Sequence, residues 1–79
     1  MKFIQSVSAK IEGETKPEVV QLGKVAFCID SISTYYEVIN KYNEPVKGVL
    51  TVISRTGQQF LVKESFESFT DKLEAHSYE

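Results

Sequence analysis

The chain has little of what most enzymes and metal proteins use. Its 79 residues include one cysteine, Cys28, one histidine, His76, and no tryptophan. One cysteine cannot form a disulfide within the chain, and one Cys with one His cannot complete a Cys/His zinc site. No Gly-rich phosphate loop, G-x-S-x-G elbow, H-E-x-x-H or C-x-x-C motif is present. The sequence therefore predicts no catalytic residue, no metal site and no cofactor, and it favours a protein that is not an enzyme.

Long apolar runs and a strong net charge are missing too. No stretch approaches the ~18 apolar residues of a transmembrane span, and residues 1–6 turn polar too early for a signal peptide. The formal net charge is -2, whereas proteins that bind nucleic acid through its phosphates usually carry a basic surplus. These features disfavour membrane and nucleic-acid partners. Together with the lone thiol, they predict a cytoplasmic protein.

The composition is that of a small folded domain. The hydrophobic share of 42% and the charged share of 25% are typical of globular proteins. We expect residues 1–79 to form a single domain, and a domain of this size buries only roughly 60% of its unfolded surface. Small domains commonly add disulfides, a metal or oligomerisation to a core worth about 3–5 kcal/mol. Since the first two are excluded, the sequence predicts a homo-oligomer.

Alternating apolar side chains predict strands in the first half of the chain. Residues 2–11 alternate as a half-buried strand, and residues 12–17 form a turn or an exposed loop. The apolar pattern then resumes until Gly23, which indicates either a bulge in one bent strand or the junction of two short strands. Residues 24–30 are apolar on both faces and give the clearest strand signal. Residues 32–39 continue as a further strand after a tight bend.

The second half of the chain predicts a loop and a hairpin. Residues 40–48 collect Asn, Pro, Gly and charge, and they indicate a loop of about nine residues. Residues 49–54 and 58–62 flank Arg55-Thr56-Gly57, which is the spacing of a hairpin with glycine in the left-handed position. We expect a three-residue loop here, because β-branched Thr56 resists the positive φ of a type I′ turn.

The C-terminal segment predicts one helix, from about residue 65 to about residue 76. Ser65 is placed as its N-cap, and Phe66, Phe69 and Leu73 form an apolar stripe. One short helix covers one side of a sheet only, whereas the central strands are apolar on both faces. We therefore expect an α+β fold, a small antiparallel, strongly curved sheet or barrel of about five strands with one C-terminal helix. The far side is covered either by curling of the sheet or by a second copy.

Two groups of side chains are candidates for interaction. The aromatic and basic group comprises Tyr35, Tyr36, Lys41, Tyr42, Lys47 and Arg55. Such mixtures build stacking platforms for single-stranded nucleic acid, but tyrosines in strands are also common cross-strand packing partners. The acidic group follows helical spacing and comprises Glu64, Glu67, Asp71 and Glu74. It indicates a solvated helix flank, or a docking surface for a basic partner. Cys28 has apolar neighbours and is expected in the core.

Residues 49–73 run from an apolar strand through a polar Gly turn and a second strand to the stretch Val62-Lys63-Glu64-Ser65 and the helix. This order, and the V-K-E-S stretch, resembles the C-terminal half of the FlbD-like flagellar and swarming-motility proteins. Residues 26–32 resemble the preceding strand of that family. Similar strand-turn-strand-helix endings occur in LytTR-type DNA-binding domains. The resemblance implies a small regulatory protein of bacteria or their phages, without active-site residues to transfer.

The leading hypothesis is a non-enzymatic regulatory or interaction module that binds a macromolecular partner through a strand edge or the helix flank, as a homo-oligomer. One alternative is a small anionic ligand held between subunits by Lys41, Lys47 or Arg55. Another is a nucleic-acid-binding module on the LytTR analogy.

Overall fold

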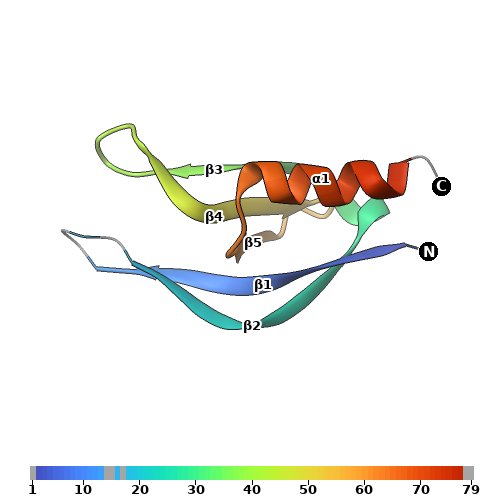
Figure 1. Cartoon of the computed structure of the whole chain (residues 1–79), viewed down its shortest axis with the longest axis horizontal. Coiled ribbons are helices and arrows are strands. Elements are labelled where there is room, and N and C mark those ends of the chain that lie inside the picture. Colours follow the sequence, from blue (N-terminus) through green and yellow to red (C-terminus); the bar gives the residue numbers. More distant parts are fainter. Residues whose placement is uncertain (1, 14–15, 17, 78–79) are drawn as a thin grey trace.

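The computed structural model describes residues 2–13, 16 and 18–77, with side chains up to residue 75. In chain order the elements are β1 (Phe3–Glu12), β2 (Glu18–Cys28), the short 3₁₀ helix η1 (Ile29–Ser31), β3 (Ile32–Ile39), β4 (Pro45–Ser54), β5 (Gln59–Val62) and α1 (Phe66–Ser77). The strands form one antiparallel sheet in the order β2-β1-β5-β4-β3, and α1 lies along it (Figure 1). The predicted α+β class with five strands and a C-terminal helix is confirmed for these residues.

The sheet is open, and a barrel is not supported. β2 and β3 are its two edges, although only the three residues of η1 separate them in the chain. The sheet is neither closed nor strongly curled. Its weakest seam lies between β1 and β5, which share the single pair Ser8 and Val62. A barrel needs a continuous, staggered ladder around its whole circumference, and β5 is only four residues long.

The β1–β2 hairpin contains the irregularity that Gly23 indicates. Its register runs without a break from the pair Phe3 and Cys28 to the pair Ser8 and Gly23, and then shifts before Ala9. Leu22 is the extra residue on β2, and its side chain is 57% exposed. The bulge alternative is therefore confirmed, and β2 is one bent strand.

The predicted nine-residue loop over residues 40–48 is wrong in its second half, because β4 already begins at Pro45. Gly48 has a φ of +79°, a conformation that glycine adopts at little cost. It lies where the β3–β4 register shifts, and it lets the strand continue through residues 45–48. Residues 40–44 form the actual loop, in which Asn40 Oδ1 accepts hydrogen bonds from the backbone N–H of Tyr42 (2.8 Å) and Glu44 (3.1 Å). Such local bonds let an asparagine organise a turn.

The β4–β5 turn has the predicted three-residue loop, residues 55–57. The Ser54 N–H donates to the Gln58 carbonyl (2.9 Å), and the Gly57 N–H donates to the Ser54 carbonyl (3.0 Å). Gly57 has a φ of +90°, as the hairpin spacing requires.

The core lies between α1 and one face of the sheet. Its buried side chains are Ile4, Phe27, Leu50, Val52, Val62 and Phe69. Phe69, from the helix, is fully buried and meets the rings of Phe27 and Tyr35 at centroid distances of 6.3 and 5.0 Å. Leu73 is partly buried against the same cluster, whereas Phe66 lies at its margin, on the Tyr35 ring. The predicted apolar stripe is therefore the docking face of α1.

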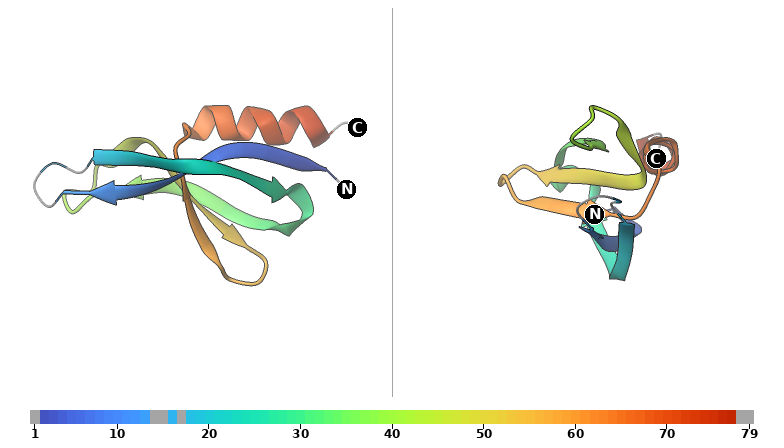
Figure 2. Two further views of the ribbon diagram at one scale, coloured as in Figure 1. Left: turned by 90° about the horizontal axis from the view of Figure 1, so that it is seen from below. Right: turned by 90° about the vertical axis from the view of Figure 1, so that its left-hand side faces the viewer.

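Ser65 is the N-cap of α1, as predicted. The hydroxyl of Ser65 accepts a hydrogen bond from the backbone N–H of Ser68 (3.1 Å). Figure 2 shows that α1 lies on one side of the sheet and that the β4–β5 turn points away from it. None of the described residues belongs to a helix with the length and hydropathy needed to cross a bilayer.

Candidate functional site

The face of the sheet turned away from α1, which we call the open face, is the first candidate surface. Tyr35 packs on the helix, so its neighbour Tyr36 points to the open face. The paired strands extend this face in two rows, Tyr36-Thr51-Leu61 and Thr34-Ile53-Gln59. Tyr36 is 44% exposed, and Thr51 is buried at the centre of its row. The open face therefore mixes apolar and polar side chains, and it is buried at Thr51 but exposed at Tyr36, on the edge strand β3.

The two edge strands are the second candidate surface. An edge strand has backbone N–H and C=O groups on one side that no neighbouring strand binds. In the described structure, β2 and β3 each have one neighbouring strand only. The large apolar side chains that are exposed are Phe3, Leu22, Tyr36, Ile39, Tyr42, Phe60 and Phe66. Several of them belong to these edges or adjoin them, so contacts with another chain could use backbone and side chains together.

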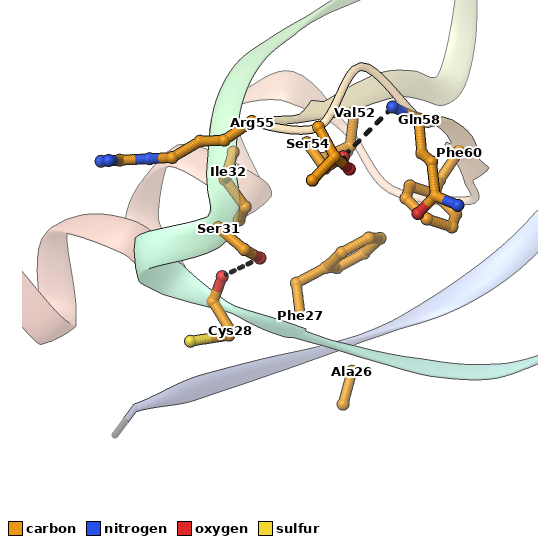
Figure 3. A pocket seen from close by; sticks show the side chains of 11 residues that line it. Ala26, Phe27, Cys28, Ser31, Ile32, Val52, Ser54, Arg55, Gln58 and Phe60 are labelled. Carbon is orange, nitrogen blue, oxygen red and sulfur yellow. Dashed lines mark hydrogen bonds between the residues drawn. The ribbon is translucent and has the colours of Figure 1, made fainter.

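A cavity of about 260 Å³ opens between the end of β2, the start of β3 and the β4–β5 turn (Figure 3). The rings of Phe27 and Phe60, 5.5 Å apart between centroids, form its apolar wall. The Ser31 hydroxyl beside it donates to the Cys28 carbonyl (2.7 Å). In Figure 3 the side chain of Arg55 points away from the cavity. The cavity therefore offers a ligand mainly apolar contact, and its one cationic lining residue does not point inward.

A groove of about 340 Å³ lies where the start of α1 meets β3 and β4. Phe66 and Ser65 line its helix side, and Lys47, Glu37 and Glu67 supply its charged groups. Two carboxylates and one ammonium group do not create the positive potential that attracts an anion. The groove of one chain therefore does not by itself favour an anion, and the predicted anion site between subunits stays a prediction.

The structure separates the aromatic and basic candidates. Tyr35 is a packing residue, since its ring contacts the helix and its hydroxyl hydrogen-bonds to Thr70 Oγ1 (2.8 Å). Tyr36 lies on the open face. Lys41 lies over the ring of Tyr42, 5.2 Å from its centroid, in the loop that follows β3. These three tyrosines therefore do not form one stacking platform within the chain.

The three basic candidates are separated as well. Lys41 lies in the loop between β3 and β4, and Lys47 follows it near the start of β4. Arg55 follows the other end of β4, where its backbone N–H donates to the Ser31 carbonyl (2.9 Å). Because β4 spans the distance between them, a site that uses all three side chains requires more than one chain.

The helix flank is only partly as predicted. Glu67, Asp71 and Glu74 are exposed on α1. Glu64 is the exception, because it precedes the helix and only 7% of its side chain is exposed. Its prediction as a member of a solvated flank is wrong.

Glu64 is instead the centre of a polar cluster that joins β1 to the helix. Its carboxylate accepts hydrogen bonds from the hydroxyls of Ser6 (2.5 Å) and Ser68 (2.8 Å) and forms an ion pair with Lys72 (2.9 Å). Lys72 also donates to the Gln5 carbonyl (2.7 Å). Burial raises the pKa of a carboxyl, but the hydrogen bonds from Ser6, Lys72 and Ser68 and the charge of Lys72 outweigh it, so the pKa of Glu64 is lowered. With every oxygen engaged, Glu64 is suited to holding the fold and not to binding a ligand.

The remaining side chains that could react or bind a metal do not form a cluster among the described residues. Cys28 is a free thiol and is partly exposed beside the cavity, so it lies at the margin of the core and not within it. Among the described residues, no group of three or more His, Cys, Asp or Glu side chains is placed to hold a metal ion.

Comparisons with protein-family models, with curated proteins and with solved structures find no match to this chain. The resemblance of residues 49–73 to the FlbD-like proteins, and to LytTR-type endings, stays a prediction. We therefore infer function from the surfaces described above.

Proposed function

We propose that the chain is a non-enzymatic regulatory or interaction module that works as a homo-oligomer and binds a macromolecular partner. The observation that carries the proposal is the incomplete cover of the sheet: α1 packs on one face, and the exposed part of the open face at Tyr36 and both edge strands are left to other contacts. Addition of a strand at a sheet edge is a common mode of protein recognition. It needs no catalytic group and no cofactor.

The size of the core supports association. The fully buried large side chains of the described structure are Phe69, Leu50, Val49, Val52 and Val62. A core this small leaves a narrow margin of stability, and burial of further apolar surface between copies would widen it.

The biological setting is part of the same proposal. The V-K-E-S stretch between β5 and α1 supports a regulator of bacterial or phage origin, through its resemblance to the FlbD-like proteins. The unpaired, partly exposed thiol of Cys28 suits the reducing conditions of a cytoplasm.

Sedimentation equilibrium tests the oligomer directly. Over a concentration range of about 1 µM to 1 mM, which covers moderate to weak affinities, the average mass should rise above the 9.0 kDa of one chain. Tyr36→Lys, on the open face, should shift this rise to higher concentration. Tyr42→Lys, an exposed tyrosine in the β3–β4 loop, is the matched control and should leave it unchanged. A mass of one chain at every concentration would refute the homo-oligomer.

A further inference from the structure

The two edge strands differ in how well they resist pairing with another chain. β2 has a bulge at Leu22 and a lysine, Lys24, close to it. Bulges and edge lysines are features by which natural sheets prevent such pairing. β3 contains neither lysine nor proline, and its unmatched residues, Ser33 and Val38, lie near its two ends. β3 is therefore the less protected edge.

The composition of β3 favours an added strand. Six of its eight residues are Ile, Thr, Tyr or Val, which suit a pleated and partly buried surface. Its register with β4 is regular from Thr34 to Glu37, so this stretch is straight enough to serve as a template. Glu37 is its single charged residue.

Opposite charges lie toward the two ends of β3. Glu37 lies in the second half of the strand and is exposed. Arg55 is hydrogen-bonded through its backbone to Ser31, just before the strand begins. Within the described residues, neither the Glu37 carboxylate nor the Arg55 guanidinium has an ion-pair partner. Figure 3 shows the Arg55 side chain directed away from the cavity, where another chain could reach it.

We infer that β3 pairs antiparallel with β3 of a second copy of this chain, about a two-fold axis perpendicular to the sheet near Tyr35 and Tyr36. A two-fold contact of this kind uses the same strand on both sides and closes as a dimer. Both helices then lie on the same face of one continuous sheet. This inference rests on the proposed function, of which it names the partner and the surface.

The antiparallel arrangement brings the unpaired charges together. In the dimer, each Glu37 lies beside the start of β3 of the second copy, and hence on the side of Arg55 of that copy. Neighbouring strands lie about 4.8 Å apart and residues rise about 3.4 Å along a strand, so the two Cα atoms are separated by roughly 12 Å. An arginine and a glutamate side chain together span much of that distance. The two copies of Glu37 remain apart, so the pairing creates no like-charge contact between them.

Charge exchange tests this interface without altering the strand backbone. Glu37→Arg and Arg55→Glu should each weaken the dimer about tenfold, because each places like charges at two symmetric contacts. The double variant Glu37→Arg/Arg55→Glu should restore the wild-type dissociation constant to within about threefold. Asp71→Arg, a charge reversal at an exposed position of α1 away from the groove where the helix meets β3 and β4, is the control and should leave dimerisation unchanged. Circular dichroism melts establish that all four variants are folded.

The outcomes separate this inference from the proposed function. A wild-type dimer that is weakened by both single variants and restored by the double variant supports pairing through β3. If the single variants leave the dissociation constant unchanged, or if the double variant binds no more tightly than either single variant, the β3 contact is refuted. The proposed homo-oligomer is not affected by that result. A wild-type chain that is monomeric throughout overturns both. A single variant that unfolds would also weaken the dimer. Unfolding cannot, however, return the dissociation constant of the double variant to the wild-type value.

Discussion

Replacement of Glu64 by glutamine tests how α1 is held against β1. The substitution keeps the shape of the side chain but removes its charge. Ser6 and Ser68 then lose a charged acceptor, and Lys72 loses its ion-pair partner. Glu64 lies in a buried position, so the side chain cannot simply turn into water.

The magnitude follows from the exposure of the partners. A hydrogen bond to a charged group contributes about 1.5–3 kcal/mol, and a glutamine oxygen retains a part of it. Lys72 is 41% exposed and can be hydrated again, so its ion pair adds at most about 1 kcal/mol. We expect Glu64→Gln to lower the free energy of unfolding by about 2 kcal/mol, which in a domain of this size lowers Tm by about 8–16 °C.

The pH dependence has a defined sign. Because the pKa of Glu64 is lower in the folded chain than its ordinary value of 4.5, ionisation of this carboxyl favours folding. Its contribution is fully present above the unfolded pKa and is lost as the pH falls through the folded pKa. Wild-type stability should therefore fall below about pH 4.5 more steeply than that of Glu64→Gln.

Urea denaturation followed by circular dichroism, at pH 7 and through the acid range, measures both effects. Asp71→Asn is the matched control, since it removes an exposed carboxylate from the middle of the same helix, away from its first turn. The control should keep wild-type stability and its acid dependence. If Glu64→Gln is as stable as wild type at pH 7 and loses stability in acid with the same slope, the polar cluster does not hold the helix.

Three further predictions probe the fold. Phe69→Ala removes the fully buried helix side chain and should cost about 3–5 kcal/mol, which leaves the chain largely unfolded in a circular dichroism spectrum at 25 °C; a cooperative melt near that of wild type would contradict the core assignment. Ser65→Ala removes the N-cap and should cost about 1 kcal/mol in a thermal melt, so an unchanged Tm would show that the cap is dispensable. Gly57→Ala forces a residue with a side chain into positive φ and should lower the free energy of unfolding in urea by about 1–2 kcal/mol. Gly23→Ala is the control, because Gly23 has open space and no positive φ, and it should be nearly neutral. Equal effects of the two substitutions would contradict the turn assignment.

Features determined by neighbours in sequence could be predicted. The glycine of the β4–β5 hairpin and the serine cap of α1 each depend on a local backbone requirement that one residue type meets. The apolar stripe of α1 could be predicted from helical spacing for the same reason.

Features that depend on residues distant in the sequence could not be predicted. Glu64 fits the helical spacing of an acidic flank, but its partner Ser6 is 58 residues away, so nothing near it in sequence marks it as buried. Gly48 indicates a loop by composition, yet its positive φ is what lets β4 continue from Pro45. The alternation of apolar and polar residues also does not encode how many residue pairs join β1 to β5. In the structure these strands share one pair, and the sheet stays open.

Amide hydrogen exchange by NMR, measured below and above the association concentration, tests most directly whether a second copy pairs with β3. Backbone amides at an unpaired edge exchange quickly, and pairing protects them. If the dimer forms through β3, amides between Thr34 and Glu37 gain protection as concentration rises, while those around Leu22 in β2 do not. Protection in β3 that is the same at every concentration, or a gain in β2 alone, would contradict it.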